Sequence, residues 1–121
     1  MTQRPNEMTV LAKAKPEPGL WMETRPVPEI GPDDVLIKIH KTGICGTDIH
    51  IWNWDAWAQK TVPVPLVTGH EFAGIIVDKG RNVEGLEIGQ RCSGEGHLIG
   101  KTSRQSRSGK FHLDPETRGI G

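Results

Sequence analysis

Glycine and proline are spread so densely along this 121-residue chain that short strands are the structure it forms most readily. Fifteen glycines and nine prolines interrupt every apolar stretch before it reaches the length of a long helix. The length suits one domain and is too short for a second of ordinary size. We therefore expect a single mainly β domain over residues 1–121, with short helices and with strands that close into a small barrel.

Alternation of apolar and polar residues predicts where the strands lie. The clearest strand is residues 35–40, whose successive side chains face opposite sides of a sheet. Pro26 and Pro28 are expected to end the strand pairing of residues 20–25. The full set of expected strands is residues 8–15, 20–25, 35–40, 72–78 and 90–93.

Two short segments carry side chains that bind metals. Cys45 opens the run Cys45-Gly46-Thr47-Asp48-Ile49-His50, in which Thr47 and Asp48 are expected to cap a short helix that carries His50. The second segment contains His70 and Glu71. A thiolate, an imidazole and a carboxylate suit Zn²⁺, and three protein ligands leave a fourth position for water or substrate. Cys45, His70 and Glu71 are therefore the predicted ligands of one catalytic zinc ion.

Each of these assignments has an alternative. His70 and Glu71 are adjacent, so both reach one metal only if the backbone turns there, which Gly69 makes easier. Otherwise Glu71 is a salt-bridging glutamate at the end of a strand. A disulfide between Cys45 and Cys92 is the alternative for an extracellular protein, whereas a cytoplasmic protein keeps both cysteines reduced.

Charge and hydropathy favour a cytoplasmic protein without a nucleic-acid or membrane partner. Fifteen basic residues balance fifteen acidic ones, and no apolar run approaches the roughly 20 residues that a membrane helix needs. Residues 96–113 are basic without any acidic residue, which is compatible with a phosphate-binding patch. Only Phe111 interleaves the cations there, so a solvated loop is the favoured interpretation. The cations are Lys101, Arg104, Arg107 and Lys110.

The residues around His70 extend to a longer pattern. From Gly69 the chain reads G-H-E-x-x-G-x-x-x-x-x-G-x-x-V, which resembles the zinc signature of the medium-chain, zinc-dependent alcohol dehydrogenase family. Within that family, residues 51–65 and 93–97 are similar to segments of the L-threonine 3-dehydrogenases. The similarity runs from about Met8 to Gly121, and it implies a GroES-like, partly open β-barrel.

The resemblance also implies an activity. Such enzymes oxidise L-threonine, a small amino alcohol, at its secondary hydroxyl to 2-amino-3-oxobutanoate with NAD. It assigns Thr47 and His50 to a proton relay, because a hydroxyl both donates and accepts and a histidine passes protons near neutral pH. On its own pattern, His50 would be a histidine on a helix surface. His97 is expected either to line the substrate pocket or to end a strand.

Two features of the family are not found in this sequence. Members carry a Rossmann domain after this region, but no G-x-G-x-x-G is present here, and Ile99 stands where a third glycine would follow Gly94 and Gly96. NAD binding is therefore expected only with that domain, and the chain alone is not expected to turn over. The family's structural-zinc lobe, about residues 98–117, is expected to be modified with its zinc lost, and residues 100–117 are expected to be mobile. Its four cysteine positions align with Gly100, Ser103, Ser106 and Asp114.

Several functional classes remain open. The chain is interpreted first as the zinc-binding catalytic domain of a threonine dehydrogenase-like oxidoreductase. The alternatives are a stand-alone zinc-binding or interaction domain without chemistry, a metal-free β domain that binds through its basic loop, and part of another zinc alcohol or polyol dehydrogenase. Relatives associate into oligomers mainly through the domain that this chain lacks, so the sequence leaves its own association open.

Overall fold

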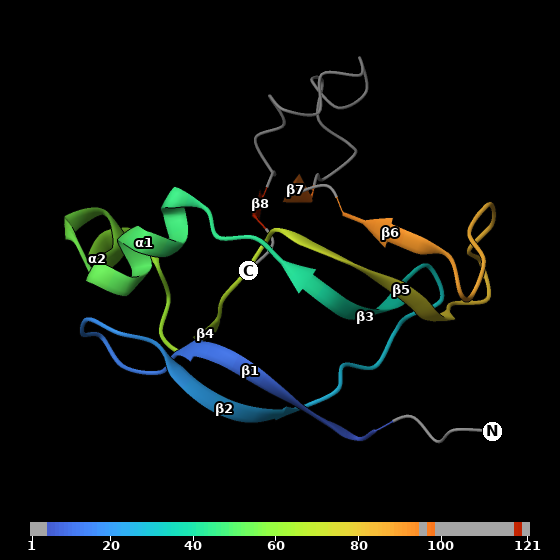
Figure 1. Ribbon diagram of the computed structural model, residues 1–121, viewed down its shortest axis with the longest axis horizontal. Helices are drawn as coiled ribbons and strands as arrows, with labels where there is room; N and C mark the ends of the chain where they lie inside the picture. The colour runs from blue at the N-terminus through green and yellow to red at the C-terminus, as the bar shows by residue number, and fades with distance from the viewer. Residues whose placement is uncertain (1–4, 95–96, 99–117, 120–121) are drawn as a thin grey trace, which may run out of the picture.

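A computed structural model describes residues 5–94, 97–98 and 118–119 of the chain (Figure 1). Strands predominate and the helices are short, as expected. The elements are β1 (Glu7–Lys13), β2 (Trp21–Pro26), β3 (Val35–Thr42), α1 (Gly46–Asn53), α2 (Ala56–Thr61), β4 (Leu66–Val67), β5 (Phe72–Lys79), β6 (Arg91–Ser93), β7 (His97–Leu98) and β8 (Arg118–Gly119).

The strands form open antiparallel sheets. One sheet has the order β2-β1-β4, a second has the order β3-β5-β6, and β7 pairs with β8. Within the part of the chain that the structure describes, the sheets do not close into a continuous barrel. The expectation of a mainly β architecture is thus confirmed, while the closure into a barrel expected from the strand pattern is not seen in the described residues.

The first sheet is built on a long hairpin. β1 and β2 pair from Glu7 opposite Pro26 to Ala12 opposite Trp21, and β4 adds to the other edge of β1. β4 has only two residues, which is too short for alternation to reveal. It brings the segment that leads to His70 against the N-terminal hairpin, because Thr68 N–H donates to the carbonyl of Leu11 at 3.0 Å.

The second sheet centres on β5, which pairs with both β3 and β6. Its register with β3 shifts between Leu36 and Ile37 and again between Ile39 and Lys41. These irregularities break the clean alternation expected over residues 35–40, and the side chain of Ile39 is 47% exposed. A bulge leaves one residue unpaired and bends the strand, so β3 does not present one uniform apolar face.

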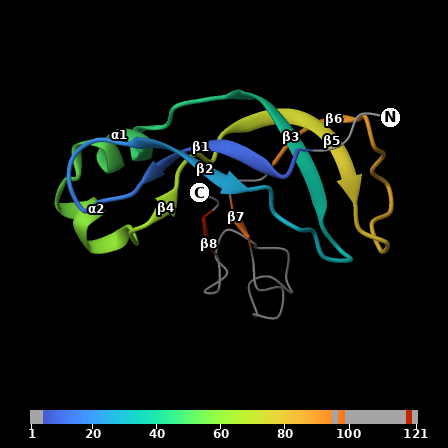
Figure 2. The ribbon, with the colours of Figure 1, turned by 90° about the horizontal axis from the view of Figure 1, so that it is seen from below.

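Both helices lie side by side at one end of the molecule (Figures 1 and 2). Each contributes one fully packed residue, Ile51 from α1 and Ala58 from α2. The sequence predicted α1 but not α2, because six residues are too few to show a helical period. Neither helix approaches the length and hydrophobicity that a bilayer crossing requires.

A buried cation joins the first sheet to the helices. Lys13, at the end of β1, has no exposed surface, and its Nζ donates to the carbonyl of Glu17 at 2.7 Å and to that of Gly19. The same Nζ lies 5.3 Å from the ring centroid of Trp21 and 5.2 Å from that of Trp54. Two carbonyls and two aromatic faces thus replace the water that the ammonium group loses.

Candidate metal centre

Cys45 stands where the chain leaves β3 and enters α1. Its backbone is extended (φ −98°, ψ 159°), so it is the residue that precedes the first helical turn. Asp48 reaches back to it, with Oδ2 accepting the Cys45 N–H at 3.0 Å. The expectation that Thr47 and Asp48 cap this helix is therefore refined: Asp48 supplies the carboxylate of the cap, and Cys45 occupies the N-cap position.

His70 and Glu71 lie immediately before β5. Gly69 has a φ of +106°, a conformation that side chains strongly disfavour, and this turn directs both following residues toward Cys45. The N–H of Gly43 donates to the Glu71 carbonyl at 2.9 Å, which ties the two segments together. The turn that a shared metal site requires at Gly69 is thus present.

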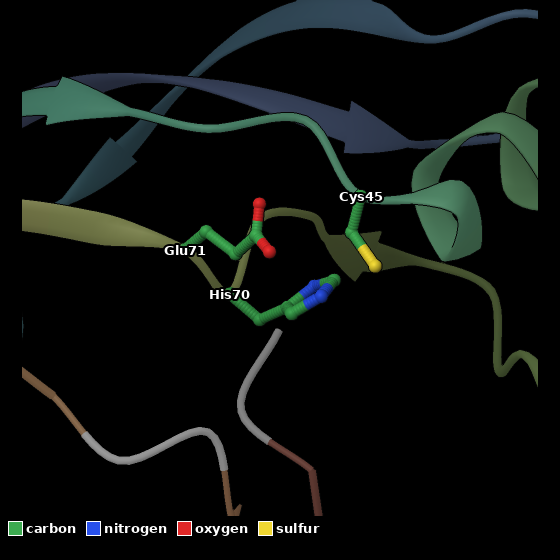
Figure 3. Close-up of side chains that lie close together, drawn as sticks. All are labelled: Cys45, His70 and Glu71. Carbon is green, nitrogen blue, oxygen red and sulfur yellow. The ribbon is translucent and has the colours of Figure 1, made fainter.

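The three predicted ligands converge. One ligand atom each from Cys45, His70 and Glu71 lies within 4.8 Å of the other two. Figure 3 shows the Cys45 thiol and the His70 imidazole close together, with the Glu71 carboxylate near the imidazole. Cys45 and His70 are half-buried and Glu71 is exposed. Among the described residues, one side of the cluster is therefore left uncovered, as a site that admits a further ligand requires.

Gly43 leaves room for the Glu71 carboxylate. A Cβ at position 43 would lie 2.8 Å from Glu71 Oε2 and 3.4 Å from Glu71 Cβ. Any side chain at position 43 would displace the carboxylate from its present place. The sequence contains no local sign of this requirement, because it arises from a residue 28 positions away.

The electrostatics of the cluster favour a thiolate. The Thr47 backbone N–H lowers the pKa of Cys45 most, followed by hydrogen bonds from His70 and from the Thr47 side chain. The pKa of His70 is raised, chiefly by its hydrogen bond with Cys45 and further by the charge of Asp48, against an opposing effect of burial. Both shifts favour the charged forms, a thiolate at Cys45 and an imidazolium at His70, over the neutral pair.

Asp48 faces the site in a way that the sequence did not reveal. Its Oδ1 is buried and accepts no hydrogen bond from the described residues. That oxygen lies 3.8 Å from His70 Nδ1. Carboxylates placed in this way orient metal-binding histidines in many proteins. The sequence indicated a capping role only, since the second role depends on a residue 22 positions away.

The two residues expected in the relay take different positions. The hydroxyl of Thr47 lies 3.7 Å from Cys45 Sγ, so it borders the cluster directly. His50 is exposed on α1, where its Nδ1 pairs with Asp55 and its ring lies 5.7 Å from that of Trp57. Residues three apart on a helix share a face, so α1 carries both side chains on one side.

The remaining sequence predictions fall at the limits of the described structure. His97 lies in β7 opposite Gly119, but its side chain is outside the described residues. The same holds for the positions of the structural-zinc lobe, namely Gly100, Ser103, Ser106 and Asp114, and for the basic residues among them. Cys45 and Cys92 are both free thiols, so the alternative disulfide is not formed.

Comparison with known proteins was consistent with this geometry. Residues 31–121 match the family described as alcohol dehydrogenase GroES-like domain. An L-threonine 3-dehydrogenase of Ruegeria pomeroyi is 78% identical over 114 residues, which make up 94% of this chain and 33% of that protein. Another, from a Chelativorans species, is 63% identical over 116 residues, covering 96% of this chain and 34% of that protein.

A solved structure shares the fold as well. The alcohol dehydrogenase TADH from Thermus sp. ATN1 superposes with a TM-score of 0.78 at 26% identity, covering 94% of this chain and 32% of that one. The chain therefore spans about a third of the length of the relatives it matches.

Proposed function

The chain belongs to the alcohol dehydrogenase GroES-like domain family, and on that premise we propose that it is the zinc-binding domain of an enzyme that oxidises L-threonine with NAD. The convergence of Cys45, His70 and Glu71 within 4.8 Å carries the proposal. The substrate is proposed from the 78% identity to an L-threonine 3-dehydrogenase. Identity at this level, over nearly the whole chain, favours threonine over other alcohols or polyols.

The residues at the site fit a zinc ion. Sulfur, imidazole nitrogen and carboxylate oxygen are all zinc donors, and the lowered pKa of Cys45 favours the thiolate that binds metal. Asp48 Oδ1, which has no hydrogen-bond partner among the described residues, is placed to accept a hydrogen bond from His70 Nδ1–H once that ring binds through its other nitrogen. A bound zinc ion supplies Lewis acidity that makes a coordinated alcohol easier to deprotonate.

Two residues of the chain provide a route for the released proton. The Thr47 hydroxyl borders Cys45 and both accepts and donates a hydrogen bond, so it can take the substrate proton while giving up its own. His50 follows one helical turn later on the same helix and is exposed. An exposed imidazole can pass a proton directly to water. We assign Thr47 and His50 to this relay.

The hydride acceptor is proposed to bind elsewhere in a longer protein. The matched relatives are about three times as long as this chain, and its sequence has no dinucleotide-binding motif. We therefore expect the 121 residues by themselves to bind zinc without transferring hydride. We also propose that the chain holds one zinc ion and not two, because no thiolate stands at the four lobe positions.

Zinc content tests the site. Elemental mass spectrometry on the full chain, purified without added metal, should find close to one zinc per chain. Cys45→Ser should remove it, because a neutral hydroxyl is a poor zinc donor. Cys92→Ser is the matched control, since Cys92 is also a free, half-buried cysteine and lies outside the cluster. Stoichiometric zinc in Cys45→Ser would refute the proposed ligands. Two zinc ions per natural chain would refute the proposed loss of the structural zinc.

Activity tests the substrate. A chimera that joins this chain to the remaining part of the Ruegeria pomeroyi enzyme should reduce NAD with L-threonine, while the chain alone should not. A zinc-loaded, folded chimera that prefers a polyol would contradict the substrate assignment. One that is inactive with every alcohol would favour a zinc-binding domain without chemistry.

A further inference from the structure

The turn between α1 and α2 places one carboxylate directly against His50. α1 ends at Asn53, Trp54 adopts a left-handed conformation (φ 53°), and Asp55 begins α2 as its N-cap. The backbone N–H of Asp55 donates to the His50 carbonyl at 3.4 Å. Gln59 Nε2 holds the turn from the other side by donating to the Trp54 carbonyl at 2.9 Å. The position of Asp55 relative to His50 is therefore set by the backbone.

The two carboxylate oxygens of Asp55 have separate partners. Oδ1 accepts the backbone N–H of Ala58 at 2.9 Å, which caps α2, and Oδ2 pairs with His50 Nδ1. The pKa of Asp55 is lowered, first by the Ala58 N–H and then by His50. Asp55 is consequently ionised at neutral pH and can only accept hydrogen bonds.

An ionised acceptor at Nδ1 dictates the state of the imidazole ring. When His50 is neutral, its single ring proton must lie on Nδ1 to be donated to Asp55, so Nε2 carries the free lone pair. The centroid of the Trp57 ring lies 5.7 Å from that of the imidazole with the planes inclined by 56°, an ordinary separation for a tilted ring pair. The pairing with Asp55 thus favours one tautomer and turns Nδ1 toward the carboxylate, although the ring is exposed to solvent.

We propose that Asp55 is the positioning residue of the relay: it fixes His50 as the Nδ1–H tautomer, so that Nε2 is the atom that accepts the proton. This inference rests on the proposed role of His50. Thr47 passes its hydroxyl proton to Nε2 as it receives the proton of the substrate. The imidazolium that forms is stabilised by the adjacent carboxylate, and Nε2 then returns the proton to water. Asp55 itself remains ionised throughout.

Two variants separate this role from capping. In Asp55→Asn the side-chain oxygen still accepts the Ala58 N–H, and the amide NH₂ faces His50 Nδ1. The opposite orientation is disfavoured, because it would place the amide NH₂ against the Ala58 N–H, which is also a donor. Nδ1 must then accept, and the proton moves to Nε2. Asp55→Ser is the matched control: serine caps a helix well, but its side chain is too short to reach His50.

The test is the tautomer of His50 in the full chain, read from the ring ¹⁵N shifts by long-range ¹H–¹⁵N NMR with ¹⁵N-labelled histidine. The chain has five histidines, and loss of one ring pattern in His50→Gln assigns the resonances. We expect the Nδ1–H form in the natural chain, the Nε2–H form in Asp55→Asn, and the ratio of free histidine in Asp55→Ser. Slow exchange of the Ala58 amide should persist in both Asp55 variants.

The NMR spectra distinguish a positioning role of Asp55 from a capping role alone. An Nε2–H form in the natural chain, or the same tautomer ratio in all three proteins, would overturn the inference and leave Asp55 as a helix cap only. Recording the spectra with and without zinc keeps this test independent of the proposed function. Failure to bind zinc would refute the metal site while leaving the tautomer result in place, and an unfixed tautomer would leave the zinc result in place.

Discussion

Gly74 is a residue at which one added methyl group should strongly destabilise the fold. It lies in the middle of β5 and pairs with Ile39 of β3 on one side and Cys92 of β6 on the other. A Cβ at this position would lie 2.2 Å from the Lys38 carbonyl oxygen and 2.8 Å from Ile37 Cγ2. The nearest obstacle is backbone, so no change of rotamer relieves the clash.

The geometry sets the size of the effect. Ordinary contact begins near 3.4 Å, so β3 and β5 must separate locally by about 1 Å. A separation of that size breaks the neighbouring ladder hydrogen bonds, each worth about 0.5–1.5 kcal/mol. Overpacking adds about 1–3 kcal/mol, and the lower entropy of unfolded alanine returns about 0.4–1 kcal/mol. We expect Gly74→Ala to lower the free energy of unfolding by about 2–4 kcal/mol.

Urea unfolding of the metal-free chain, followed by tryptophan fluorescence, measures this loss. Gly46→Ala is the control, because a Cβ there meets nothing within 4 Å and the residue lies in α1. Gly46 is the first residue of α1, so alanine there should change the free energy of unfolding by less than about 0.5 kcal/mol. If Gly74→Ala were as stable as the natural chain, the close approach of the two strands would be refuted. The same variant should also bind zinc more weakly, since His70 and Glu71 directly precede β5.

Three smaller changes probe the site and its surroundings. Gly43→Ala should displace the Glu71 carboxylate and weaken zinc binding about tenfold in a chelator competition, with the free energy of unfolding changed by less than about 0.5 kcal/mol; unchanged affinity would exclude Glu71 as a ligand. The pKa of Lys13 lies below its ordinary 10.5, because the effect of burial outweighs the opposing charge of Glu17. Just below that pH the unfolded chain therefore binds more protons than the folded chain, so the natural chain should become more stable as the pH rises toward 10.5. In urea unfolding between pH 8 and 10, Lys13→Met should lack this rise in the free energy of unfolding. The same pH slope in both proteins would contradict the lowered pKa of Lys13. In the metal-free Cys92→Ser chain, the lowered pKa of Cys45 should make alkylation by iodoacetamide persist to lower pH than for glutathione; coincident pH profiles would contradict the thiolate.

Much of the β framework could be predicted from local pattern. The expected strands at residues 72–78 and 90–93 correspond closely to β5 and β6. For β5 the local signal is an apolar run close to glycines. The short elements β4 and α2 were missed because two and six residues carry no readable period. The bulges in β3 were missed because register depends on the partner strand.

The candidate ligands were also readable, but their surroundings were not. Cys45, His70 and Glu71 stand out because few side chains bind zinc and because Gly69 permits the turn that a shared site needs. The position of the second oxygen of Asp48 and the space left by Gly43 appear only when distant segments meet, and the pairing of His50 with Asp55 depends on the left-handed turn at Trp54. None of these three features leaves a trace in local periodicity.

The sequence by itself determined the kinds of donors at the site and the places where the backbone must turn, because both are properties of single residues: thiol, imidazole and carboxylate chemistry, and the conformational freedom of glycine at position 69. Only the tertiary structure decided that Cys45 meets a pair of residues 25 positions away and that Lys13 is buried beneath two tryptophans. The reason is physical. Strand pairing and burial are set by contacts between segments that are remote in the chain, and their energies depend on the whole fold and not on any local stretch.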